Sequence, residues 1–183
     1  DKLSSRVNIN GSTMNGLNTQ SRTGAGNPIV QALAWAPTTD PYDGRGGYRI
    51  SDPVGSIKTN PLCLIYDTEN RNERTFANLM AGTRYELIKG LALDFQVGTD
   101  LSFRTAKTFS GNYASNYSPS ASITDNKSVN IQTTTQLSYD KTFNDIHKIS
   151  AVAVFETQKY TNNSVTASSA NLKFADLKYD NLP

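Results

Sequence analysis

Residues Leu91 to Arg104 alternate between two kinds of side chain without interruption. Even-numbered positions are polar, charged or very small, and odd-numbered positions are apolar or Thr: Leu91, Leu93, Phe95, Val97, Thr99, Leu101 and Phe103. A period of two is typical of a strand with one face in an apolar medium and the other in water. These fourteen residues span about 46 Å at roughly 3.3 Å per residue, whereas a strand of a globular domain has about five or six residues. A bilayer-crossing strand needs about nine to eleven, so the pattern predicts a transmembrane β-strand with its polar row facing a wet lumen.

Four further segments show the same alternation with varying regularity. Residues 75–87 and 129–139 are long enough to cross a bilayer, and residues 3–9 and 149–157 match less well. In the last segment Val152 and Val154 fall on the face that also carries Glu156. We therefore expect an all-β fold, an antiparallel transmembrane β-barrel segment with about five strands near residues 3–10, 74–88, 91–107, 128–142 and 147–161.

Short and long connections alternate between these strands. Only Ile88, Lys89 and Gly90 separate the second and third segments, and a compact turn joins the last two. The connections 11–73 and 108–127 are long, and residues 162–183 are expected to begin a further loop. Outer-membrane barrels combine short periplasmic turns with longer extracellular loops, which assigns the long connections to the outside. On that assignment Tyr85 and Tyr139 lie at the periplasmic end of the lipid-facing row, either as aromatic girdle residues or as ordinary cross-strand packing.

The first long loop carries signals of internal structure. Asn27 followed by Pro28 predicts a helix N-terminus, with the helix running over the apolar residues up to Trp35 and ending before Pro37. A second small apolar anchor follows at Asn60–Leu64, with Cys63 as a small buried hydrophobic residue. A loop of this length with its own apolar residues is expected to be ordered.

Composition narrows the possibilities without deciding between a soluble and a membrane protein. The chain has 183 residues, 37% of them hydrophobic, with 18 basic and 16 acidic side chains, and its mean hydropathy is −0.49. No run approaches the eighteen apolar residues of a transmembrane helix, but alternation hides a barrel strand from such averages. The scattered charge argues against nucleic acid as a partner. The chain starts at Asp1 without an apolar signal region, so we expect a mature protein or a segment of a larger one.

The candidate chemistry argues against an enzyme. Asp94 and Asp100 are six residues apart on one strand, about 20 Å, which is too far for the paired carboxylates of a glycosidase. A single Cys and the single His147, in a polar turn, exclude a disulfide and a multi-histidine metal site. We expect no catalytic residue, cofactor or metal, and we interpret the charged residues of the polar rows as lumen-facing: Arg84, Glu86, Asp94, Asp100 and Arg104.

Two groups of loop residues leave alternatives open. Asp40, Asp43 and Asp52 suggest Ca²⁺, but they lack the ligand spacing of an EF-hand, and turn chemistry is favoured. Four loop tyrosines either stack on sugar, contact a partner or pack within the loops: Tyr42, Tyr48, Tyr113 and Tyr117.

Several stretches together resemble one family, the SusC/RagA-type TonB-linked outer-membrane transporters of Bacteroidetes. The resemblance rests on NPIVQALAWAPTTDPYDGRGGY (27–48), NPLCLI (60–65), YELIKGLALDFQVGTDLS (85–102) and QLSYDKTFNDIHKISAVAVFETQKY (136–160). It implies an internal wall segment of a barrel with about 22 strands and a plugged lumen. It also implies import of glycans, oligosaccharides or peptides with a SusD-like surface lipoprotein, driven by TonB through an N-terminal box.

This chain departs from that family pattern by omission, because it contains no recognisable plug domain or TonB box. Open sheet edges in lipid are costly, so the resemblance implies that remaining barrel and plug segments complete the wall in the outer membrane of a Gram-negative cell. The alternative is a soluble, secreted β-sandwich that binds carbohydrate through aromatic loops. In that fold the odd-numbered rows would pack on a second sheet about 10 Å away.

Overall fold

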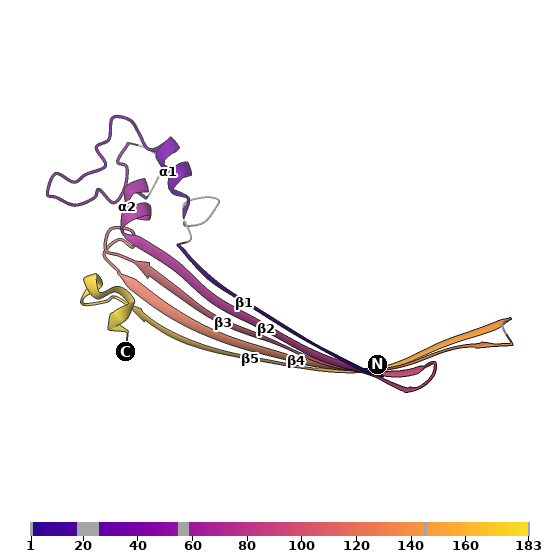
Figure 1. The fold of residues 1–183 in the computed structure, drawn as a ribbon. Coiled ribbons are helices and arrows are strands. Elements are labelled where there is room, and N and C mark those ends of the chain that lie inside the picture. Colours follow the sequence, from indigo (N-terminus) through magenta and orange to yellow (C-terminus); the bar gives the residue numbers. More distant parts are fainter. Residues whose placement is uncertain (1, 18–25, 55–58, 145, 183) are drawn as a thin grey trace. The chain divides into compact units, whose positions relative to one another are not determined.

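The computed structural model describes residues 2–17, 26–54, 59–144 and 146–182. Five antiparallel strands form one sheet in the order β1-β2-β3-β4-β5, so each strand pairs with its neighbours in sequence (Figure 1). The strands are β1 (Leu3–Leu17), β2 (Thr68–Ile88), β3 (Leu91–Ser110), β4 (Ser120–Phe143) and β5 (His147–Ala170). The expected all-β, antiparallel fold is confirmed. Within the described residues no helix is long and apolar enough to span a membrane.

The chain divides into two compact units. The first, here called the strand unit, comprises Asp1–Thr13, Thr75–Phe103 and Asn126–Asn163. The second, here called the loop unit, comprises Met14–Arg74, Arg104–Asp125 and Ser164–Pro183. The strand unit contains the alternating segments, and the loop unit contains the two long connections.

Two hairpins organise the strand unit. Lys89 and Gly90 alone separate β2 from β3, as the sequence predicts, and Gly90 has a φ of 89°, which favours glycine. The β4–β5 turn uses Asn144 with a φ of 50°. The register follows from paired side chains on facing strands: Ser5 bonds Thr83 at 3.2 Å and Thr133 bonds Thr157 at 2.6 Å.

Every strand is longer than its alternation predicts. β1 runs to Leu17 instead of residue 10, β2 starts at Thr68 instead of 74, and β5 runs to Ala170 instead of 161. The connections expected at 11–73 and 108–127 are correspondingly shorter, and part of 162–183 is strand. The extensions carry polar residues on both faces, as in the TENRNER stretch that opens β2. Backbone pairing continues there although neither face is apolar. The alternation of apolar and polar residues therefore does not show where these strands end.

The loop unit contains the helices α1 (Pro28–Ala34) and α2 (Pro61–Tyr66), each begun by an Asn-Pro pair. The Asn27 side chain caps α1, as predicted, by accepting from the N–H groups of Ile29 and Val30. The helix ends at Ala34, one residue before the expected Trp35. Asn60 caps α2 by accepting from Leu62 N–H at 2.9 Å, and Cys63 in α2 is fully buried, as expected.

A small apolar core forms where β3, β4 and the end of the chain meet within the loop unit. Phe109, Ala121 and Leu172 are buried there. The 3₁₀ segment η2 (Ala175–Asn181) covers them with Ala175 and Tyr179. The tail expected to be a loop is therefore partly ordered against the sheet.

Candidate functional site

The even-numbered positions of the strand unit carry most of its charged and amide side chains. On β2 and β3 the Arg84 guanidinium reaches the Asp94 carboxylate at 2.9 Å. The Asp94 side chain is 17% exposed and the Arg84 side chain is 56% exposed. The carboxylate is therefore the more buried partner of this ion pair. Two of the five charged residues expected on this face therefore pair across strands, as the alternation suggested.

A second polar network crosses four strands of the same unit. Asp100 on β3 accepts from the amide of Asn78 on β2 at 2.6 Å and from that of Asn130 on β4 at 3.2 Å. The Asn130 oxygen in turn accepts from Gln158 on β5 at 2.9 Å. No cation is among these bonding partners, so neutral amides hold the Asp100 carboxylate. In the sequence, Asn78, Asn130 and Gln158 are even-numbered positions of three different strands, and nothing there indicates that they meet.

The two remaining charged candidates have other surroundings. Glu86 lines a cleft with Arg84, Ala92, Ser138 and Asp140, and its carboxylate makes no hydrogen bond or ion pair within the described part of the chain. Arg104 belongs to the loop unit, where its Nε donates to Asn72 at 2.9 Å. The structure therefore brings Arg84, Glu86 and Asp94 together in the strand unit. Asp100 lies farther along the same strand as Asp94.

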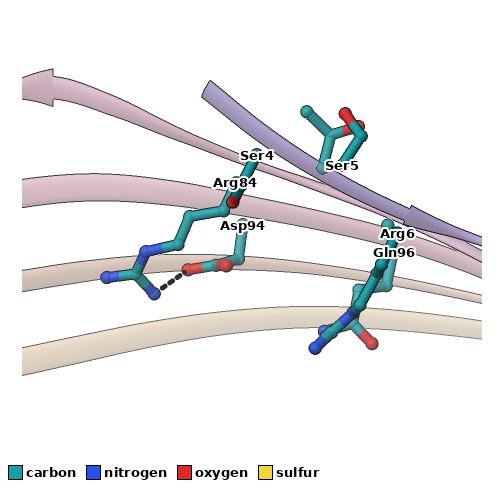
Figure 2. Close-up of a pocket in the computed structure, with 8 residues that line it drawn as sticks. Ser4, Ser5, Arg6, Arg84, Asp94 and Gln96 are labelled. Atoms are coloured by element: carbon teal, nitrogen blue, oxygen red, sulfur yellow. Dashed lines mark hydrogen bonds and ion pairs between the residues drawn. The ribbon is translucent and has the colours of Figure 1, made fainter. Parts of the chain in front are cut away.

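A cleft opens on the polar face at the edge formed by β1, and Figure 2 shows its lining. The Arg84–Asp94 pair borders it, and the side chains of Arg6 and Gln96 lie beside each other next to Gly82. A Cβ at Gly82 would lie 3.2 Å from Gln96 Cγ and 3.3 Å from Arg6 Nε. The absence of a side chain at Gly82 therefore leaves room for the side chains of Arg6 and Gln96 to lie against the backbone of β2. Sequence reasoning did not select Arg6 or Gln96, although both occupy even-numbered positions.

The odd-numbered face of the strand unit carries most of its large apolar side chains. Large apolar side chains on this face are partly or largely exposed, among them Phe95 at 47% and Phe155 at 68%. Its polar members are mainly hydroxyls that pair with each other, such as Thr133 with Thr157. Val152 and Val154 lie with Glu156 on the even-numbered face, because Glu156 and Gln158 bond to the even-numbered residues of β4. Apolar and polar rows are therefore well separated on β3 and β4, interrupted on β2 by Phe76 and Met80 at even-numbered positions, and mixed on β5.

The loop carboxylates are used for turns. Asp43 accepts from the N–H groups of Arg45 and Gly47 at 2.7 and 2.9 Å. These two bonds hold the pKa of Asp43 below its usual value. Asp52 accepts from Ala36 N–H at 2.9 Å and from the Thr39 hydroxyl at 2.9 Å. Asp43 makes the turn bonds that the sequence favoured, and Asp52 makes one by accepting from Val54 N–H at 3.0 Å. The described residues include no group of three His, Cys, Asp or Glu side chains that could hold a metal ion.

The four loop tyrosines come together into one row of rings within the loop unit. Tyr42 stacks on Tyr48 with ring centroids 5.9 Å apart, Tyr48 meets Tyr113 edge-on at 5.4 Å, and Tyr113 contacts Tyr117 at 6.2 Å. The inner rings are half-buried, and burial raises the pKa of Tyr48. The end rings are exposed, Tyr42 at 52% and Tyr117 at 65%. This tyrosine row joins residues more than sixty positions apart, a contact that spacing alone does not reveal.

The thiol of Cys63 is buried in α2. Burial raises its pKa to about 11, so the thiolate that reacts with electrophiles or metals is scarce near neutral pH. The expectation that Cys63 serves as a small hydrophobic residue is confirmed by its complete burial.

The fold has close counterparts among solved structures. It superposes on chains of the RagAB peptide importer in its closed-closed state, of the RagAB peptide transporter and of the importer in its open-open state. The TM-scores are 0.71, 0.74 and 0.69, and the sequence identities are 19%, 18% and 19%. The match covers 94%, 94% and 92% of this chain but only 20%, 20% and 19% of those chains. No protein-family model matches the sequence, and the search of curated proteins found no match. The chain therefore has the fold of a segment, about a fifth of the length, of the RagAB chains that it resembles.

Proposed function

We propose that this chain forms part of the barrel wall of a TonB-dependent importer of the SusC/RagA type in a Gram-negative outer membrane. The observation that carries the proposal is the contrast between the two faces of the strand unit. One face exposes large apolar side chains such as Phe95, and the other carries the Arg84–Asp94 pair and the Asp100 amide network. A transmembrane barrel needs this arrangement, apolar toward lipid and polar toward the lumen. The fold shared with RagAB chains supports it independently.

The soluble sandwich is less well supported. It requires a second sheet over the odd-numbered rows, whereas the five described strands lie in one sheet. The edges formed by β1 and β5 would be completed by further barrel strands, because unpaired backbone groups are costly in lipid.

The partners and cargo follow from the same proposal. The RagAB structures are of a peptide importer, which supports peptides ahead of glycans or oligosaccharides as the imported solute. A SusD-like lipoprotein would cover the extracellular mouth, TonB would act through a region outside this chain, and a plug would fill the lumen. Arg84, Glu86, Asp94, Asp100 and Arg104 would face that lumen.

Cysteine labelling tests the assignment of the two faces. In a variant with Cys63→Ala, a second substitution is made at Gln96→Cys or at the adjacent Val97→Cys, and intact cells are treated with a small membrane-impermeant maleimide. We expect labelling of the even-numbered site and protection of the odd-numbered one. The pair Gln132→Cys and Ile131→Cys repeats the comparison on β4. Equal labelling within both pairs, or a reversed pattern, would contradict a lipid-facing odd-numbered row.

A further inference from the structure

Tyr117 ends a turn in the left-handed region of the backbone, and its N–H donates to the Asn112 carbonyl at 2.6 Å. Its φ is 63°, and that of the preceding Asn116 is 55°. The left-handed region is unfavourable for a bulky side chain, and such residues cluster where strain serves function. The ring is nevertheless 65% exposed, so burial offers little compensation. The closed turn therefore fixes the backbone of Tyr117 while its ring stays exposed at the end of the tyrosine row.

The remainder of the tyrosine row is held in place by backbone hydrogen bonds. Asp67 accepts from the N–H groups of Tyr113 and Ala114 at 2.6 and 2.8 Å. On the other loop, Asp43 fixes the turn at Gly47, where an added Cβ would lie 2.3 Å from the Tyr113 hydroxyl. Only glycine leaves room for that ring. The exposed ends of the row, Tyr42 and Tyr117, are therefore mounted on a preorganised support.

The residue types around the row are those of adaptable binding loops. Residues 110–118 read SGNYASNYS and carry no charged side chain. Tyr offers rigid, amphipathic contact area at low entropic cost, while Ser, Gly and Asn supply adaptable hydrogen bonds. Two exposed rings provide much less area than the roughly 800 Å² per partner of a stable protein–protein interface, so a small ligand fits better than a protein surface.

We propose that the tyrosine row is a binding subsite for an extended oligopeptide, with Tyr42 and Tyr117 stacking on its apolar or aromatic side chains. The phenol hydroxyls and the exposed amides of Asn112 and Asn116 would bond to its backbone. This inference rests on the proposed importer function, because it supplies that importer with a first contact for its cargo.

The test uses the intact importer purified in detergent with its co-purifying subunits. The probe is a fluorescein-labelled Gly-Ser decapeptide with a central Phe-Leu pair, and binding is read from anisotropy. Tyr117→Gly removes the ring while suiting the left-handed backbone, so the loop stays folded. We expect it to weaken binding about two- to tenfold, and Tyr42→Ala to do the same. Tyr117→Phe keeps the ring and should bind within about twofold of the wild type. Tyr85→Ala, on the odd-numbered face of β2, is the control and should leave affinity unchanged.

The outcomes separate this subsite from the function on which it rests. If the wild-type protein binds no peptide, the proposed importer of peptides fails. If it binds and Tyr117→Gly binds equally well, the importer stands and the subsite is wrong. Dependence of maltohexaose binding on Tyr117, without any effect on the peptide, would overturn the ligand class. Loss of a co-purifying subunit at unchanged peptide affinity would identify the row as a protein contact instead.

Discussion

The strand unit and the loop unit differ in what they bury, because Ala92 alone among the buried hydrophobic residues of the described chain lies in the strand unit. In the strand unit Phe95 and Phe155 remain exposed on one face, and the Arg84–Asp94 ion pair and the Asp100 amide network link the strands on the other face. In the loop unit Asn60 and Cys63 are fully buried, and Phe109 and Leu172 form a core. The loop unit is thus stabilised by contacts among its own residues. In the proposed outer-membrane location, lipid would cover the apolar face of the strand unit.

The largest expected effect tests the apolar face of the strand unit. Phe95→Arg would place a charge in the proposed lipid layer and should lower the free energy of unfolding by roughly 2–4 kcal/mol. Urea titration of the intact protein refolded into lipid vesicles measures this change. Asp94→Asn and Gln132→Arg, both on the even-numbered face, should cost far less. Equal losses in all three variants would remove the distinction between the faces.

The next largest effect tests whether the loop unit is stabilised independently of the strand unit. The buried Asn60 amide donates to the carbonyls of Pro41 and Arg49 at 2.7 and 2.8 Å and caps α2. Asn60→Ala leaves these groups unsatisfied and should destabilise the loop unit by roughly 2–3 kcal/mol. Hydrogen exchange should then accelerate across residues 36–54 and 59–66 and stay unchanged in residues 91–103. Acceleration spread evenly over both regions would mean that the two units unfold together.

The smallest effect concerns the attachment of η2. Lys178 and Tyr179 both donate to the Glu69 carboxylate, at 2.6 and 3.0 Å. The Lys178 hydrogen bond holds the pKa of Glu69 below its usual value of 4.5. A lowered folded-state pKa means that this stabilisation is complete above about pH 4.5 and is lost as the pH falls through the lowered value. Glu69→Gln should cost roughly 1 kcal/mol at pH 7.

Limited proteolysis of the C-terminal segment at pH 7 and pH 3 measures the attachment of η2. The wild-type segment should become more susceptible at the lower pH, after correction for the activity of the protease. Glu69→Gln should show much less of this difference. A wild-type pH response that persists undiminished in Glu69→Gln would assign the response to another group.

Local signals predicted those parts of the fold that depend on neighbouring residues. The hairpin at Lys89–Gly90 and the Asn27 cap of α1 were both foreseen, because turn and cap chemistry act within a few residues. Strand ends were not foreseen. The outer parts of β2 and β5 pair through their backbone, and backbone pairing leaves no period in side-chain polarity.

The sequence by itself determined which residues share a face, because the side-chain period of a strand is fixed by its covalent geometry. That was enough to place Arg84, Asp94 and Asp100 on one polar face and Phe95 on the other. Only the tertiary structure decided which members of that face meet, since the register between strands sets every cross-strand pair. It joined Asp100 to Asn78 and Asn130, set Arg6 beside Gln96, and brought Tyr42 and Tyr117 into one row. Contacts between residues far apart in sequence depend on the folded path of the chain, which the period of a single strand does not encode.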